Sequence, residues 1–152
     1  MLFRSRLCSI AYESVAENAN IVELNEEYHK SFMETHNIAF PDAYWTGERL
    51  LKALDKFDIF IAVEEANIIG SVVTSKFTRT IEEIYFLDVV EDKRNQGYGT
   101  ALINKAIKHA FDNGTDELMV MVEKDNMVAL HLFEKLGFRK ADTCLTYSMK
   151  LR

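Results

Sequence analysis

The sequence predicts a mixed α/β fold in which helices cover both faces of a central sheet. Segments with helical and with strand periodicity alternate along the whole chain, which is typical of this fold class. A length of 152 residues fits one domain, and one Pro and six Gly leave little room for a linker. We therefore expect a single domain over residues 1–152.

The first third of the chain is expected to form one strand and two helices. Residues Leu2–Tyr12 suit a strand. Apolar side chains recur at helical spacing over Asn20–His36, which predicts a helix with His29 and His36 at its surface. After a loop, Thr46 is a good N-cap for a short helix over residues 46–51.

Three strands are predicted in the middle of the chain. Phe57–Val63 and Ile68–Thr74 are rich in β-branched and aromatic residues. The polar segment between them, residues 64–67, predicts a hairpin connection. Ile81–Val90 has the same composition and is the third strand of this group.

The second half of the chain predicts two longer helices and further strands. Gly97–Phe111 has apolar residues on one helical face, and Glu117–Val122 reads as a strand. Asn126–Leu136 predicts another helix, because Gly137 follows it as a suitable terminating residue. From Phe138 onward we expect one or two last strands, ending within residues 143–151.

The charge of the chain argues against one class of partner. With 18 Lys+Arg against 24 Asp+Glu, the net charge is −6 and the pI is about 5.2. A nucleic-acid-binding protein would instead show a basic surface. Residues 1–76 carry 12 acidic and 7 basic side chains, so 7 − 12 = −5 of the net charge lies in the first half.

The sequence also predicts a compartment. Cys8 and Cys144 are too few and too far apart for a zinc site or a disulfide framework. No segment approaches the roughly 18 apolar residues of a membrane span. The apolar stretch after the basic N-terminus is too short for a signal peptide. We expect a cytoplasmic protein with no metal and no membrane partner.

The segment Leu87–Thr100 is the most informative stretch of the sequence. A strand ends, a polar turn follows, and Gly97 and Gly99 open a helix. Glycine allows a ligand to approach the backbone closely, and free N–H groups at a helix start attract anions. Arg94 adds a positive charge nearby. The segment suits a pyrophosphate, although an ordinary strand-to-helix turn would explain the same residues.

A second motif lies about 30 residues further on, in the predicted helix that starts at Asn126. Together the two motifs resemble those of the GNAT superfamily of N-acetyltransferases. The family's first motif, Arg/Gln-x-x-Gly-x-Gly/Ala, is matched by Arg94, Gly97 and Gly99. Its second motif, Asn-x-x-Ala-x-x-Leu-Tyr-x-x-x-Gly-Phe, is matched by Asn126, Ala129, Leu132, Gly137 and Phe138.

The resemblance implies a mixed, mostly antiparallel sheet of about six to seven strands, with acetyl-CoA as the cofactor. In that family the sheet splays open beside the strand that precedes the glycines, and the cofactor lies in the opening. The residues expected to contact acetyl-CoA are Val89, Val90, Arg94, Asn95, Gln96, Gly97, Tyr98, Gly99, Thr100, Asn126 and Phe133.

The resemblance also suggests the catalytic residues. Glu83 is the expected general base, and strand periodicity places it on one face with Tyr85, Leu87 and Val89. Glu82 and Asp88 would then lie on the other face. Many members carry a tyrosine acid where this chain has Phe133, which cannot donate a proton. Two alternatives are open for a catalytic chain: the thiolate leaves unassisted, or Tyr147 or Tyr98 replaces the acid.

The expected function is transfer of an acetyl group from acetyl-CoA to a primary amine by direct attack. The acidic first half favours a cationic acceptor, either a small molecule or a peptide. No nucleic-acid partner is expected, and a homodimer is possible because homodimers are common in the family. The alternative, which the same loop would serve, is a non-catalytic acyl-CoA-binding or sensory module.

Overall fold

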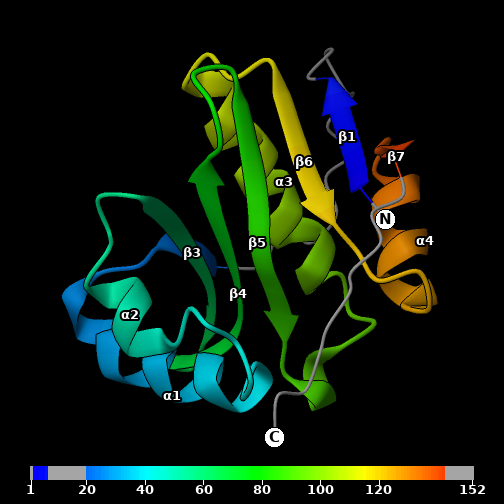
Figure 1. Cartoon of the computed structure of the whole chain (residues 1–152). Coiled ribbons are helices and arrows are strands. Elements are labelled where there is room, and N and C mark those ends of the chain that lie inside the picture. The colour runs from blue at the N-terminus through cyan, green and yellow to red at the C-terminus, as the bar shows by residue number, and fades with distance from the viewer. Residues whose placement is uncertain (1, 7–19, 143–152) are drawn as a thin grey trace, which may run out of the picture.

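The structure is a computed structural model that describes residues 2–6 and 20–142 (Figure 1). Its strands are β1 (Leu2–Arg6), β2 (Asn20–Glu23), β3 (Phe57–Glu64), β4 (Asn67–Lys76), β5 (Ile81–Val89), β6 (Glu117–Met121) and β7 (Arg139–Asp142). Its α-helices are α1 (His29–Ala39), α2 (Gly47–Leu51), α3 (Tyr98–Asp112) and α4 (Met127–Lys135). Two short 3₁₀ turns, η1 (Glu26–Tyr28) and η2 (Glu91–Lys93), precede α1 and α3.

The strands form one sheet in the order β2-β3-β4-β5-β6-β1-β7. Five of the six pairings are antiparallel, and only β5 and β6 run parallel. The fold class is therefore the mixed, mostly antiparallel sheet that the sequence predicts.

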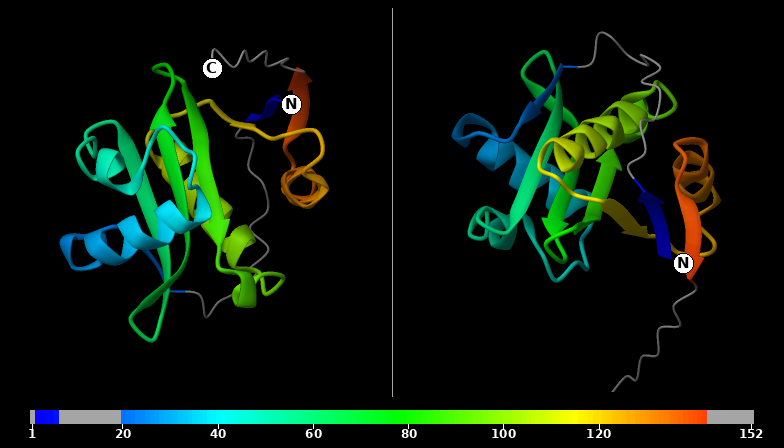
Figure 2. Two further views of the ribbon diagram at one scale, coloured as in Figure 1. Left: turned by 60° about the horizontal axis from the view of Figure 1, so that its bottom comes forward. Right: turned by 90° about the horizontal axis from the view of Figure 1, so that it is seen from above.

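Two hydrophobic cores hold the helices on the sheet (Figures 1 and 2). Helices α1 and α2 cover one face, where Phe32 and Leu50 are fully buried against β3 and β4. Helix α3 covers the opposite face through Leu102 and Ile103, and the same core includes residues of α4. We name these the α1–α2 face and the α3 face.

The prediction that the first helix starts at Asn20 is wrong. Asn20–Glu23 forms the edge strand β2 and pairs antiparallel with β3, where the β-branched Ile21 and Val22 suit an extended chain. Asn25 then accepts a hydrogen bond from the N–H of Glu27 and caps η1, so α1 begins only at His29.

The first and last predicted strands are described only in part. Leu2–Arg6 is a strand, as predicted, and pairs with both β6 and β7. Residues 7–12 of the predicted strand lie outside the described residues, and so does the segment 143–151.

Strand β5 contains a β-bulge. Ile84 lies opposite Thr74 of β4, but Phe86 lies opposite the very next residue, Val73. Tyr85 is therefore an extra residue without a partner in β4, and such a bulge reverses the facing of every later side chain.

The bulge overturns the predicted arrangement of β5. Beyond it, Leu87 and Val89 pack in the core of the α3 face, not beside Glu83. Ile84 also packs there, so alternation directs its neighbour Glu83 toward the α1–α2 face. Asp88 lies between two residues of the α3 face and therefore shares the α1–α2 face with Glu83.

Within residues 2–6 and 20–142, the second half of β5 pairs with a strand along one edge only, and its other edge is called the free edge below. The parallel pairing with β6 covers only Ile81–Ile84, whereas β5 continues to Val89 along β4. In Figure 1 the two strands run side by side near one end and then separate. Among the described residues, no helix has the length and apolar character needed to cross a membrane.

Candidate active site

The segment that joins β5 to α3 has an unusual backbone. After η2, Arg94 is extended, and Asn95 (φ 59°) and Gly97 (φ 90°) adopt the left-handed conformation. Asparagine tolerates this conformation, and glycine has no Cβ to oppose it. Residues 94–100 are named the glycine loop below. Gly97 is the N-cap of α3 and supplies no side-chain cap.

The glycine loop presents a row of unused hydrogen-bond donors. The backbone N–H of Ala101 donates to the carbonyl of Gly97, which is the first bond of helix α3. None of the six preceding N–H groups, from Asn95 to Thr100, has a hydrogen-bond partner among the described residues. Such donors at a helix start, reinforced by the helix dipole, form a site for an anionic group such as a phosphate.

The fold requires glycine at position 97 but not at position 99. The positive φ of Gly97 would strain any other residue. Gly99 has no such constraint, and an added Cβ would meet only Leu132 at 3.5 Å and Val89 at 3.9 Å, which are ordinary contacts. A helical glycine also costs about 1 kcal/mol relative to alanine. The packing of the chain therefore does not require glycine at 99, whereas close approach of a ligand would.

Arg94 braces the loop against β5. Its Nε donates to the carbonyl oxygen of Val89 at 2.8 Å, and its Nη2 lies 3.5 Å from the carboxylate of Asp88. The N–H of Val90 donates to Ile69 of β4. Alternation then turns the backbone groups of Val89 away from β4, toward the free edge of β5.

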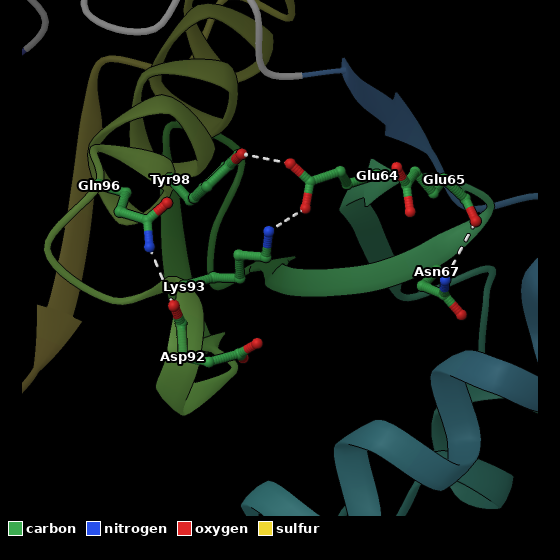
Figure 3. A network of polar contacts seen from close by, with 7 residues as sticks. All are labelled: Glu64, Glu65, Asn67, Asp92, Lys93, Gln96 and Tyr98. Atoms are coloured by element: carbon green, nitrogen blue, oxygen red, sulfur yellow. Dashed lines mark hydrogen bonds and ion pairs between the residues drawn. The ribbon is translucent and has the colours of Figure 1, made fainter.

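A polar network links the loop to the β3–β4 hairpin (Figure 3). The Glu64 carboxylate accepts hydrogen bonds from Lys93 Nζ and, at 3.3 Å, from the hydroxyl of Tyr98. The hydrogen bond with Lys93 lowers the pKa of Glu64, and Glu64 raises the pKa of Lys93 in return. Within the same segment, the side-chain Nε2 of Gln96 donates a hydrogen bond to the carbonyl oxygen of Asp92 at 2.9 Å.

Two buried carboxylates lie side by side in β5 but face opposite ways. Glu82, 1% exposed, accepts a 2.7 Å hydrogen bond from the Thr115 hydroxyl below α3. Glu83, 5% exposed, has no hydrogen-bond partner among the described residues. Burial raises the pKa of Glu83 above its ordinary value, as expected for a desolvated carboxylate.

Aromatic side chains share the α1–α2 face with this carboxylate. Tyr85 is partly exposed and makes an edge contact with Phe57 at 5.5 Å, and Phe57 contacts Trp45 at 4.8 Å. Burial raises the pKa of Tyr85, and the nearby charge of Glu83 adds to this. Glu83 therefore faces a largely apolar surface beside one tyrosine hydroxyl.

His36 is not at the surface, contrary to the prediction. It is buried among Phe32, Phe40 and Phe86, and its Nε2 lies 2.9 Å from the carbonyl oxygen of Trp45. Burial lowers the pKa of His36. This contact fixes the loop between α1 and α2. The sequence offered one usable signal, since His36 lies four residues after Phe32 on the apolar stripe.

Two further predicted residues, Asn126 and Phe133, have structural roles in helix α4. Asn126 caps α4, because its side chain accepts the N–H of Ala129 at 3.1 Å. Phe133 is 2% exposed and packs against Phe138 at 5.1 Å, so it offers little surface to a ligand. Tyr147, a predicted catalytic residue, lies outside the described residues.

Two carboxylates of the first half of the chain pair with basic side chains elsewhere in the fold. Glu64 pairs with Lys93 of η2, and Asp58 lies 3.2 Å from His109 of α3. Within residues 2–6 and 20–142, no group of three or more His, Cys, Asp or Glu side chains is placed to hold a metal ion.

Known proteins are similar to this chain in sequence and in fold. The model of the acetyltransferase (GNAT) family matches residues 21–138. A mycothiol acetyltransferase from Corynebacterium efficiens is 25% identical over 131 residues, which is 80% of this chain and 44% of the relative. An acetyltransferase from Yersinia pestis is 30% identical over 89 residues, covering 58% of this chain and 62% of the relative. The chain thus spans less than half of the mycothiol acetyltransferase that it matches.

A solved structure extends the likeness to the fold. AAC(6')-Iy in complex with the bisubstrate analog CoA-S-monomethyl-acetylneamine superposes with a TM-score of 0.73 at 19% identity, covering 88% of this chain and 99% of that one. At this level of identity the likeness concerns the fold alone. The family model spans the elements from β2 through α4, including the glycine loop. The chain therefore belongs to the acetyltransferase (GNAT) family.

Proposed function

We propose that this chain is an N-acetyltransferase that binds acetyl-CoA at the glycine loop and acetylates a primary amine. The observation that carries the proposal is the row of six unpartnered N–H groups from Asn95 to Thr100. It suits the CoA pyrophosphate, and the lack of a Cβ at Gly99 permits close approach to the backbone. The backbone of Val89 at the free edge of β5 would pair with the pantetheine arm. Gln96, Asn126 and Phe133 remain predicted contacts.

The residues of the α1–α2 face would handle the amine. Bound acetyl-CoA would supply the acetyl group as a thioester. Glu83 would take a proton from the ammonium form of the acceptor, directly or through a water, because only the neutral amine is nucleophilic. Its raised pKa suits a base that works near neutral pH. Phe133 cannot protonate the leaving thiolate, so a tyrosine such as Tyr147 or Tyr98, or solvent, would do so.

The acceptor class is proposed more broadly, as a small cationic molecule or a peptide amine. The net charge of −5 over residues 1–76 supports it. The names of the relatives point the same way, since one is a mycothiol acetyltransferase and a structural neighbour is bound to an acetylneamine analog. We also propose a single domain, a cytoplasmic location and no nucleic-acid partner.

Release of free thiol from acetyl-CoA tests the proposal against a panel of polyamines, aminoglycosides and peptide amines. Amine-dependent thiol release, with acetylated product seen by mass spectrometry, is the expected result. Tight acetyl-CoA binding without turnover on any amine would instead favour a non-catalytic acyl-CoA-binding module. Absence of acetyl-CoA binding would refute the assignment of the loop.

A further inference from the structure

We propose that Glu64, at the end of strand β3, is a positioning residue that holds the glycine loop open for the phosphates of CoA. Its carboxylate binds Lys93 and Tyr98, which are the residues on either side of the segment Arg94–Gly97 (Figure 3). This inference rests on the proposed function, because it assumes that the loop binds phosphate.

The position of the two partners supports this role. Lys93 is the last residue of η2, and Tyr98 is the first residue of α3. One carboxylate therefore fixes both ends of a four-residue segment that includes two left-handed residues, Asn95 and Gly97. The N–H groups of Asn95, Gln96 and Gly97 have no partners among the described residues, so contacts at the two ends of the segment help to fix the directions in which these groups point.

The hairpin that carries Glu64 is itself tightly defined. Only Glu65 and Ala66 separate β3 from β4, and both have positive φ, 48° and 64°, as in a type I′ turn. The side chain of Asn67 donates to the carbonyl of Glu65 at 3.0 Å. A turn this short gives Glu64 a fixed position relative to the loop, although the two are far apart in the sequence.

The negative charge of Glu64 makes its role testable, because the two possible roles predict opposite changes in CoA affinity when the charge is removed. A carboxylate beside an anion site repels the anion, so its removal should strengthen CoA binding if charge alone mattered. If Glu64 positions the loop, its removal weakens CoA binding despite that gain. Glu65 provides the matched control, because it carries the same charge one residue away and makes no side-chain hydrogen bond or ion pair among the described residues.

The experiment compares wild type, Glu64→Ala and Glu65→Ala with acetyl-CoA and with acetyl-pantetheine, which lacks the pyrophosphate. Glu64→Ala should raise KM for acetyl-CoA about fivefold, the limit set by a partly exposed ion pair. It should leave KM for acetyl-pantetheine, KM for the amine and kcat unchanged. A merely structural defect would affect all of these together. Glu65→Ala should match wild type or bind acetyl-CoA slightly more tightly.

A double-mutant cycle with Lys93→Met completes the test. If Glu64 acts through Lys93, Glu64→Ala should cost less in the Lys93→Met background than in wild type. Unchanged or tighter acetyl-CoA binding by Glu64→Ala would overturn the positioning role and leave the proposed function standing. A wild type that does not prefer acetyl-CoA to acetyl-pantetheine would refute both.

Discussion

The glycine loop and the surroundings of Glu83 flank the same strand, β5, but they are built from different parts of the chain. The loop offers backbone N–H groups that are exposed by two left-handed residues and a helix start. The Glu83 region offers a side chain, buried beside aromatic rings and without a hydrogen-bond partner among the described residues. The proposed binding site is thus built from backbone geometry, whereas the proposed base is a desolvated carboxylate.

The comparison between the two neighbouring carboxylates should give the largest effect. Glu83→Gln should lower kcat by about 100-fold or more, because it removes the base without changing the side-chain volume. Glu82→Gln is the matched control, since Glu82 faces Thr115 on the α3 face and its amide analogue can keep that hydrogen bond. Steady-state kinetics with a saturating amine measures both. Equal losses in the two variants, or none in Glu83→Gln, would remove Glu83 as the base.

The second comparison separates strain from binding at the glycine loop. Gly97→Ala should raise KM for acetyl-CoA about tenfold, equivalent to about 1.4 kcal/mol. It places a Cβ on a residue with φ of 90° and shifts the neighbouring N–H groups. Gly114, with φ of 74° and open space around it, lies just beyond the other end of α3. Gly114→Ala introduces the same kind of backbone strain and should lower the free energy of unfolding by about 1 kcal/mol. Its KM for acetyl-CoA should equal that of wild type. Equal KM values would show that the loop does not bind the phosphates.

The smallest expected effect concerns stability. Because the pKa of Glu83 is raised in the folded state, its ionisation near pH 7 destabilises the fold, and this cost disappears as pH falls below the ordinary value of 4.5. Glu83→Gln should therefore raise Tm at pH 7 by a few degrees, as about 1 kcal/mol would in a chain of this size. At pH 4 the two proteins should melt alike. A lower Tm at pH 7 would contradict the burial penalty.

The sequence predicted the two regions unequally, for physical reasons. The glycine loop was predictable because its backbone restricts residue type, most clearly at Gly97. The contact between Glu64 and Lys93 was not, because it joins residues 29 positions apart that carry no motif. Strand β5 was predicted, but Ile, Tyr, Phe and Leu follow one another over residues 84–87, so no polar alternation marked the bulge at Tyr85.

The remaining error, at the start of the predicted first helix, has a similar cause. Ile21 and Leu24 fit a helical stripe, but Ile21 and Val22 also fit an edge strand, and pairing with β3 decides between them. Local spacing could not include this contact with a distant strand.

The bulge at Tyr85 also limits how this chain can be recombined with its relatives. A hybrid that kept every residue of β5 but paired it regularly with a relative's β4, without the bulge, would still read as a continuous strand. It would nevertheless turn Leu87 and Val89 out of the core and direct the Asp88 carboxylate into it. A crossover in β5 must therefore keep the bulge, and not only the hydrophobic character of the strand.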